Sequence, residues 1–226
     1  MNKKTLIQAL VLSIASLTSL CASAAFTLNA TRYVYQEGQR NIAVQVTNNS
    51  GDLYGGQVWI DNASEQDQGV YFTPAPAFFK AGAGQKQLIR ILKISPFLPK
   101  DKESIFWLNV QEIPPKGNGE GNSLAIALNT RVKMIYRPQT IAAGREKAEE
   151  RLMVHGQVLK NPTPYYFAIT DVKVNGRTLQ LKKSIISKLG MMTPLSEINL
   201  GKVPKGIIEI EALDDYGAAR KYTLVQ

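Results

Sequence analysis

The sequence has a single cysteine, a single histidine and no long hydrophobic run after its first two dozen residues. Cys21 belongs to that first segment, so a chain that loses the segment has no disulfide and depends on apolar burial for stability. Zinc centres, thiol nucleophiles and the usual hydrolytic triads then lack their components. We therefore expect no enzyme: no catalytic residue, no metal site and no cofactor.

The remaining candidates for chemistry are weak. His155 lies alone in an alternating strand pattern, which favours a structural histidine. The glycines of residues 117–121 do not precede a helical pattern, so a phosphate-binding loop is not supported. Neighbouring carboxylates occur at Asp214-Asp215 and Glu149-Glu150, but adjacent residues on a strand or turn point apart. That arrangement argues against an acid–base pair.

The first 24 residues have the order of a secretory signal peptide. Lys3 and Lys4 precede an apolar run over residues 6–20, and small residues follow at 22–24. The run is short for a spanning helix, which favours a cleaved signal, after Ala24 or Ala25, over a membrane anchor. Its removal lowers the formal net charge from +9 to +7 because two lysines leave. Export of this basic chain argues against a nucleic-acid partner, and we expect no membrane insertion.

Short alternating segments separated by turn residues fill the rest of the chain and predict an all-β fold. Six or seven strands precede residue 138, and Pro74-Ala75-Pro76 is expected to interrupt the sheet. The charged stretch 145–152 is typical of a solvated linker or one helical turn. Beyond it we expect strands over residues 153–160, 167–175, from about 182 onward, 206–213 and 218–225. Two β-sandwich domains follow, at residues 25–140 and 146–226.

The segment from Leu124 to Pro138 is the most unusual, because it alternates as one strand longer than the roughly three to ten residues that strands usually span. We expect part of its apolar face to serve another molecule. Its other face is cationic, with Arg131, Lys133 and Arg137. From the spacing alone, this face could simply be exposed to solvent. The spacing also does not show that Arg32, in the first expected strand, lies near Lys133.

Four segments in a fixed order carry a resemblance to a known family: Thr31–Tyr35, Leu98–Pro115, Lys133–Pro138 and Asn161–Tyr166. With them the chain resembles the periplasmic pilus-assembly chaperones of the chaperone-usher pathway. The resemblance implies two immunoglobulin-like β-sandwich domains in an L shape, with a cleft between them. It implies a periplasmic protein that binds and caps pilus (fimbrial) subunits by donor-strand complementation and delivers them to an outer-membrane usher.

The resemblance also implies roles for eight residues. Arg32 and Lys133 match two cleft cations that bind the terminal carboxylate of a subunit. The other assignments are a donor strand at Leu124, Ile126 and Leu128 and an interdomain ion network at Glu103, Arg137 and Asp215. The loop 116–122 is short and has no flanking cysteines, which is similar to the short-loop subclass of these chaperones.

Two alternatives of other classes stay open at this point. A structural pilus protein would be expected to carry a disulfide and an alternating amino-terminal extension, and this chain has neither. A secreted carbohydrate-binding sandwich would use exposed aromatics, whereas Trp59, Phe106 and Trp107 are typical of a core or its edge. Self-association of the free protein, which would cover the apolar strand, also stays open.

Overall fold

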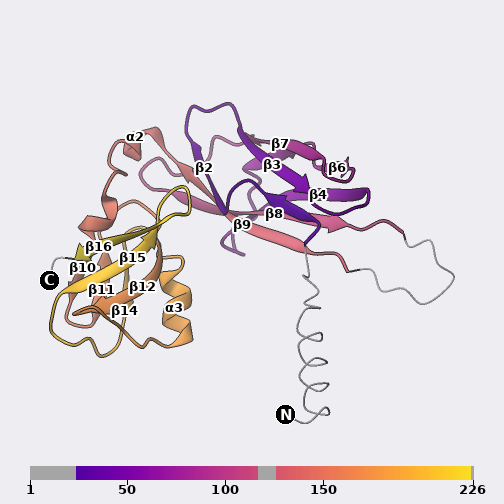
Figure 1. The fold of residues 1–226 in the computed structure, drawn as a ribbon. Coiled ribbons are helices and arrows are strands. Elements are labelled where there is room, and N and C mark those ends of the chain that lie inside the picture. The colour runs from indigo at the N-terminus through magenta and orange to yellow at the C-terminus, as the bar shows by residue number, and fades with distance from the viewer. Residues whose placement is uncertain (1–23, 117–125, 225–226) are drawn as a thin grey trace, which may run out of the picture.

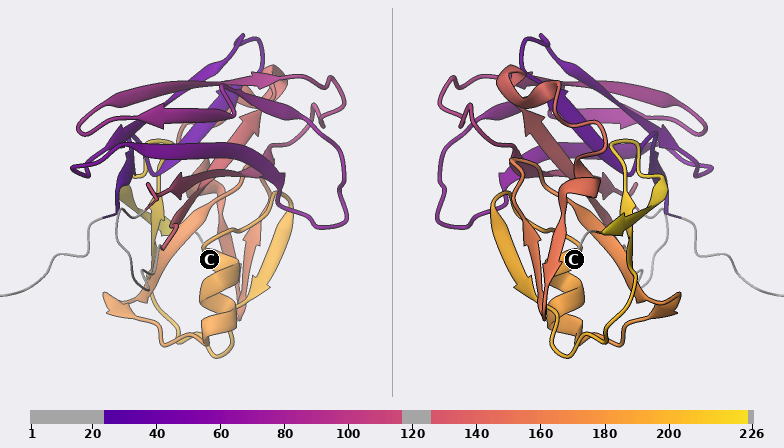
Figure 2. Two further views of the ribbon diagram at one scale, coloured as in Figure 1. Left: turned by 90° about the vertical axis from the view of Figure 1, so that its right-hand side faces the viewer. Right: turned by 90° about the vertical axis from the view of Figure 1, so that its left-hand side faces the viewer.

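The computed structural model describes residues 24–116 and 126–224, and these form two β-sandwiches set at an angle to each other (Figure 1). The expected all-β, two-domain fold is confirmed. In both side views the amino-terminal strands lie across the top and the carboxy-terminal sandwich lies below them (Figure 2). The signal segment lies outside the described residues. Within those residues, every helix is too short or too polar to span a bilayer.

The amino-terminal sandwich packs a four-stranded sheet against a five-stranded one. The first has the order β1-β3-β7-β5, with bounds Phe26–Leu28, Ile42–Asn48, Lys86–Lys93 and Phe72–Ala75. The second has the order β2-β9-β8-β4-β6, with bounds Arg32–Gln36, Asn129–Arg137, Ser104–Ile113, Tyr54–Asn62 and Phe78–Ala81.

The carboxy-terminal sandwich pairs a three-stranded sheet with a four-stranded one. The orders are β10-β11-β14 and β13-β12-β15-β16. The respective bounds are Met153–His155, Val158–Asn161 and Ser196–Asn199, then Arg177–Thr178, Ala168–Val174, Ile208–Leu213 and Ala219–Leu224. Three short helical elements complete the described chain: α2 (Gln139–Ala142), the 3-10 turn η1 (Ala148–Arg151) and α3 (Lys183–Leu189).

Each sandwich has its own hydrophobic core, made by every second residue of the facing strands. In the first core, Val44 and Ile89 from one sheet meet Leu108 and Met134 from the other, and all four are fully buried. The second core gathers residues from Ala148 to Leu224 in the same way. Burial on one face of each sheet therefore accounts for the alternation seen in the sequence.

The expected long strand from Leu124 to Pro138 is corrected at its start, because β9 begins at Asn129. Its neighbour β8 ends at Ile113, and the next two residues are prolines, which have no N–H for a ladder. The ladder between the two strands therefore ends here, and its last regular pair joins Gln111 to Asn129. One further hydrogen bond, from the Glu112 N–H to the Leu128 carbonyl at 2.9 Å, extends the contact. Leu124 lies outside the described residues.

Two other strand predictions change. The expected interruption at Pro74-Ala75-Pro76 comes at the end of this segment: β5 includes Pro74 and pairs with β7 as an edge strand, where a missing N–H is tolerated, but it stops at Ala75, and β6 belongs to the other sheet. The strand expected from about residue 182 is instead α3. Ile185 and Leu189 lie one helical turn apart and both pack on the second core, so helical spacing and not alternation governs this segment.

A third expected strand, over residues 153–160, is a hairpin of β10 and β11. His155 pairs with Val158 across Gly156, which has a φ of +62° that favours glycine in a tight turn. The alternating pattern was read correctly on both sides, but the turn within it was missed.

Truncation of a core residue should destabilise the amino-terminal sandwich selectively. We expect Leu108→Ala to lower the free energy of unfolding by about 2–5 kcal/mol, because it removes a fully buried aliphatic side chain from between two sheets. Urea unfolding measures this loss. The matched control is Leu88→Ala on β7. Leu88 is 44% exposed, so this substitution should cost under about 1 kcal/mol, as is usual for surface changes. Equal losses for the two variants would contradict the placement of the core.

Candidate functional site

Arg32 and Lys133 lie opposite each other where the two sandwiches meet. The parallel ladder of β2 with β9 begins at this pair. From the carboxy-terminal domain, the Leu213 carbonyl accepts a hydrogen bond from Arg32 Nη1 at 3.3 Å, and the Gly190 carbonyl accepts one from Lys133 Nζ. The structure thus brings together the two cations that spacing alone could not join.

The electrostatics of this pair favour an anion. Burial lowers the pKa of Lys133, and the neighbouring positive charge of Arg32 lowers it further. Burial likewise lowers the pKa of Arg32, against the opposing effect of Asp215. Among the described residues, Arg32 Nε finds no hydrogen-bond acceptor although its residue is only 8% exposed. Two partly desolvated like charges with an unused donor would gain charge-assisted hydrogen bonds from a bound carboxylate.

The space beside the two cations is small. Arg32 and Lys133 line a pocket together with Tyr166, Phe167 and Gly190, and its volume of about 10 Å³ leaves room for about one water molecule. In this structure, the Gly190 carbonyl already occupies the position of a partner for Lys133.

The strand β9 has one edge that is only partly used. Its residues Lys133–Arg137 pair with β2 on one side, whereas the whole strand up to Tyr136 pairs with β8 on the other. Within the described chain, Asn129–Val132 pair with β8 alone. This segment presents a row of backbone donors and acceptors that can accept one more strand.

The apolar residues along this edge divide into two groups. Met134 and Tyr136 are buried in the amino-terminal core, and Val132 packs against it, as the alternation predicts. Earlier in the chain, Leu128 is 44% exposed and Ile126 is 65% exposed. These two side chains have no core of their own to fill and remain free to contact another molecule.

A buried ion network joins the domains next to the cleft. Arg137 Nε donates to Glu103 Oε1 at 2.6 Å, and the two terminal nitrogens of Arg137 donate to both oxygens of Asp215, at 2.6 and 2.9 Å. Glu103 also accepts the backbone N–H of Tyr166, and its own N–H donates to the Pro164 carbonyl. Arg137 therefore joins the other two residues expected from the resemblance, Glu103 in its own domain and Asp215 across the domain boundary.

Burial has opposite outcomes for the two acids of this network. It raises the pKa of Glu103, and the charge and hydrogen bond of Arg137 only partly oppose the rise. Burial also raises the pKa of Asp215, but the hydrogen bonds and charge of Arg137, together with Arg145, outweigh it and the net pKa is lowered. Asp215 is therefore the acid whose ionised form the fold favours.

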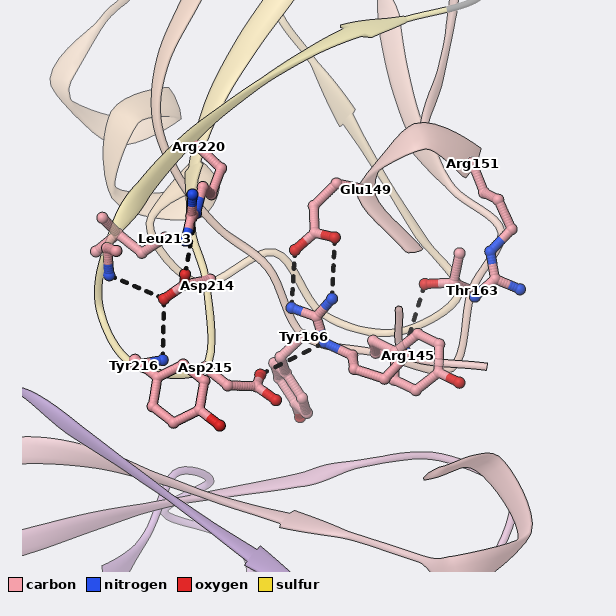
Figure 3. A network of polar contacts seen from close by, with 12 residues as sticks. Arg145, Glu149, Arg151, Thr163, Tyr166, Leu213, Asp214, Asp215, Tyr216 and Arg220 are labelled. Atoms are coloured by element: carbon pink, nitrogen blue, oxygen red, sulfur yellow. Dashed lines mark hydrogen bonds and ion pairs between the residues drawn. The ribbon is translucent and has the colours of Figure 1, made fainter. Parts of the chain in front are cut away.

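Two members of the network were missed in the sequence. Arg145 donates from its two terminal nitrogens to both oxygens of Glu149 at 2.9 and 2.8 Å, and its Nε lies 3.5 Å from Asp215 Oδ1 (Figure 3). Of the two alternatives expected for this stretch, one helical turn is confirmed by η1. A solvated linker does not fit, since Glu149 is 2% exposed and the Arg145 side chain 13%. Their i, i+4 spacing over an expected helical turn was the available signal.

The other sequence candidates do not form a site. His155 is exposed, and no group of three or more metal-ligating side chains comes together within residues 24–116 and 126–224. Asp214 accepts the backbone N–H groups of Tyr216 and Ala218, whereas Asp215 points toward Arg145 (Figure 3) and accepts hydrogen bonds from Arg137. These neighbouring acids point apart, as the sequence indicated. The glycines of 117–121 lie outside the described residues.

Comparison with protein families now assigns the chain. The model of the pili and flagellar-assembly chaperone, PapD N-terminal domain, matches residues 25–142, and that of the pili assembly chaperone PapD, C-terminal domain, matches residues 148–224. The chain belongs to the pilus-assembly chaperone family. This membership favours a chaperone over the carbohydrate-binding and structural pilus alternatives.

The pilus-assembly chaperone family includes several similar proteins. The chaperone protein FanE of Escherichia coli is 48% identical over 219 residues, which cover 92% of this chain and 96% of FanE. The chaperone protein FaeE of Escherichia coli is 36% identical over 92% of this chain and 81% of its own. The crystal structure of the periplasmic chaperone SfaE superposes with a TM-score of 0.72 at 32% identity, covering 89% of this chain and all of SfaE.

The interdomain network predicts a pH-dependent stability of this pilus-assembly chaperone. Because the pKa of Asp215 is lower in the folded state, its contribution is fully present above the unfolded pKa of about 3.9 and is lost as the pH falls through the folded pKa. We expect Asp215→Asn to cost about 2–4 kcal/mol of unfolding free energy at pH 7 and progressively less below about pH 4. Urea unfolding over this pH range measures it, and a deficit independent of pH would contradict this role of the carboxylate.

Proposed function

We propose that this pilus-assembly chaperone is exported to the periplasm, holds pilus subunits by lending them an edge of β9, and passes them to an outer-membrane usher. The observation that carries the proposal is the register of Arg32 opposite Lys133, at the point where β2 begins and the edge of β9 becomes free. The signal-like segment 1–24 supports export, and family membership supports the pilus subunit as client.

The two cations select the direction of a bound strand. β2 runs parallel to β9 and starts at Arg32. A client strand pairing with Asn129–Val132 lies ahead of β2 in the same row, so one of its ends meets Arg32 and Lys133. A parallel strand brings its terminal carboxylate there, whereas an antiparallel strand would bring an ammonium group against two cations. The client therefore binds parallel to β9, anchored by its last residue.

The exposed aliphatic side chains then complete the client. A subunit that lacks a strand has an unpaired edge and an apolar groove, and both favour aggregation. Backbone pairing covers the edge, while Leu128 and Ile126 enter the groove at every second position, with Leu124 as the third expected member. At roughly 1.5–3 kcal/mol for each fully buried aliphatic side chain, the three contribute about 5–9 kcal/mol before the costs of association.

The ion network of Glu103, Arg137 and Asp215 has a structural role in this proposal. It holds the two domains at the angle that faces Arg32 and Lys133 into the cleft. Buried charge networks favour a defined geometry more reliably than they add stability. We assign domain limits of 25–140 and 146–226, supported by the two separate cores. The short loop at 116–122 supports the short-loop subclass, and no enzymatic step is needed.

Loss of the anchor should prevent client capture. The test is to co-express the mature chaperone with the fimbrial subunit encoded beside it and to measure soluble one-to-one complex. We expect Arg32→Ala and Lys133→Ala each to reduce the complex by about tenfold or more, since each removes a charge-assisted hydrogen bond. Lys160→Ala, which removes an exposed lysine paired with Glu197 in the other domain, is the matched control. Undiminished capture by folded anchor variants would refute the anchor.

Removal of the apolar side chains tests the donor strand separately. We expect the triple change of Leu124, Ile126 and Leu128 to Ser to lower subunit recovery while thermal unfolding of the free chaperone stays within about 0.5 kcal/mol of wild type, because Ile126 and Leu128 are exposed. The control is Leu88→Ser, an exposed leucine on the opposite sheet. A triple variant that recovers as much subunit as the control would contradict the lending of these side chains.

A further inference from the structure

We propose that Arg145 is a positioning residue for the anion-binding cations, acting through Asp215 and the β15–β16 turn on Arg32. The inference rests on the proposed function, because it concerns how the same cleft is held ready for a carboxylate. Two contacts in series connect Arg145 to Arg32: Arg145 with Asp215, and the Leu213 carbonyl of the same turn with Arg32.

The first contacts fix Arg145 itself. Its guanidinium binds both oxygens of Glu149 in a two-bond pair, and it lies 5.4 Å from the ring centre of Phe167 and 5.7 Å from that of Tyr165. Its side chain is only 13% exposed. A guanidinium held by a fork and two rings has little freedom to move, so it presents a fixed charge to its other neighbour.

That neighbour is Asp215. Arg137 approaches this carboxylate from the amino-terminal domain, through two hydrogen bonds, and Arg145 approaches it from the linker, at 3.5 Å from Oδ1. Oδ1 thus lies between both arginines (Figure 3 shows the Arg145 side). Arg137 ties Asp215 to the other domain, whereas Arg145 ties it to the body of its own domain. The two cations thus approach the turn from two directions, in addition to the hydrogen bonds that Asp214 makes within it.

The turn that carries Asp215 reaches Arg32. Two residues earlier, the Leu213 carbonyl accepts the hydrogen bond of Arg32 Nη1. Two residues later, Gly217 has a φ of +88° and approaches Thr31 so closely that any Cβ would collide with Thr31 Oγ1. The turn therefore packs on Thr31 and binds Arg32 with the carboxylate of Asp215 between these two contacts.

Loss of Arg145 would leave Glu149 as a buried carboxylate without its cation and would free the turn on the linker side. We expect the Leu213 carbonyl then to lose its fixed place and the Arg32 guanidinium to lose its orientation. The protein would keep its fold, because Arg137 still joins Glu103 and Asp215 across the boundary. What it would lose is preference for a carboxylate over an uncharged chain end.

The experiment compares two synthetic peptides with the carboxy-terminal sequence of the fimbrial subunit that is encoded beside the chaperone. One peptide ends in a free acid and the other in an amide. The ratio of their dissociation constants for the full-length mature chaperone reports the anchor alone. We expect Arg145→Met to reduce the wild-type acid preference by about tenfold, with amide binding unchanged. Arg151→Met is the matched control, since Arg151 lies 5.6 Å from the same Tyr165 ring but hydrogen bonds only to the Gly144 carbonyl among the contacts described.

The outcomes separate the two proposals. A wild-type protein with no acid preference would overturn the carboxylate anchor and the proposed function with it. A clear wild-type preference that a folded Arg145→Met variant retains would overturn only the positioning role. If Arg145→Met does not fold, Glu149→Gln, which keeps the shape but removes the charge partner, replaces it. We expect about a threefold loss of acid preference for Glu149→Gln, and an unchanged ratio would overturn the inference.

Discussion

A ladder of five residues joins β2 in parallel to the second half of β9, and the surroundings of the cleft depend on its register. Tyr33 and Tyr35 fix that register, since both are buried in the amino-terminal core on the face of β2 opposite to Arg32. A slip by one residue would exchange the faces and place the arginine in the core. The two buried tyrosines thus keep the charge of Arg32 at a partly desolvated position that is unfavourable for an isolated charge.

Two neighbouring cations at a domain interface carry an electrostatic cost, and the structure offsets it in two ways. Main-chain carbonyls of the second domain accept their hydrogen bonds, and a chain of alternating charges runs close by through Glu103, Arg137, Asp215, Arg145 and Glu149. The negative charge of Asp215 faces both Arg137 and Arg32. The same network that orients the domains therefore also makes the cationic cleft tolerable without a ligand.

Much of the fold could be predicted from the sequence because apolar and polar residues alternate along a strand that is buried on one face only. Met134 and Tyr136, two residues apart on β9, are both buried for this reason. The segment around Ile185 and Leu189 failed because a helix of seven residues is too short for its period to stand out from strand-like apolar spacing. Turns within a pattern, such as that at Gly156, were lost in the same way.

The residues of the candidate site were likewise predictable only in part. Arg32, Lys133, Glu103, Arg137 and Asp215 came from a resemblance in four segments, and periodicity alone could not have joined residues about a hundred positions apart. The carbonyls of Leu213 and Gly190 have no side-chain signature, so no sequence pattern could indicate them. Arg145 and Glu149 had a recognisable spacing, but charged residues are usually solvated, and only the packing of Phe167 and Tyr165 against Arg145 explains their burial.

The distance between the two cations and the exposed aliphatic side chains is fixed, so the cleft favours a bound strand of one length. Leu128 lies five residues before Lys133, which is about 17 Å along an extended chain. In the proposed function, a client whose last residue is held at the cations would present each earlier residue at a set height along β9. One residue added to or removed from its tail would turn the alternate side chains to the wrong side. The chaperone would thereby discriminate between subunits both by the presence of a terminal carboxylate and by the number of residues between that carboxylate and the apolar groove.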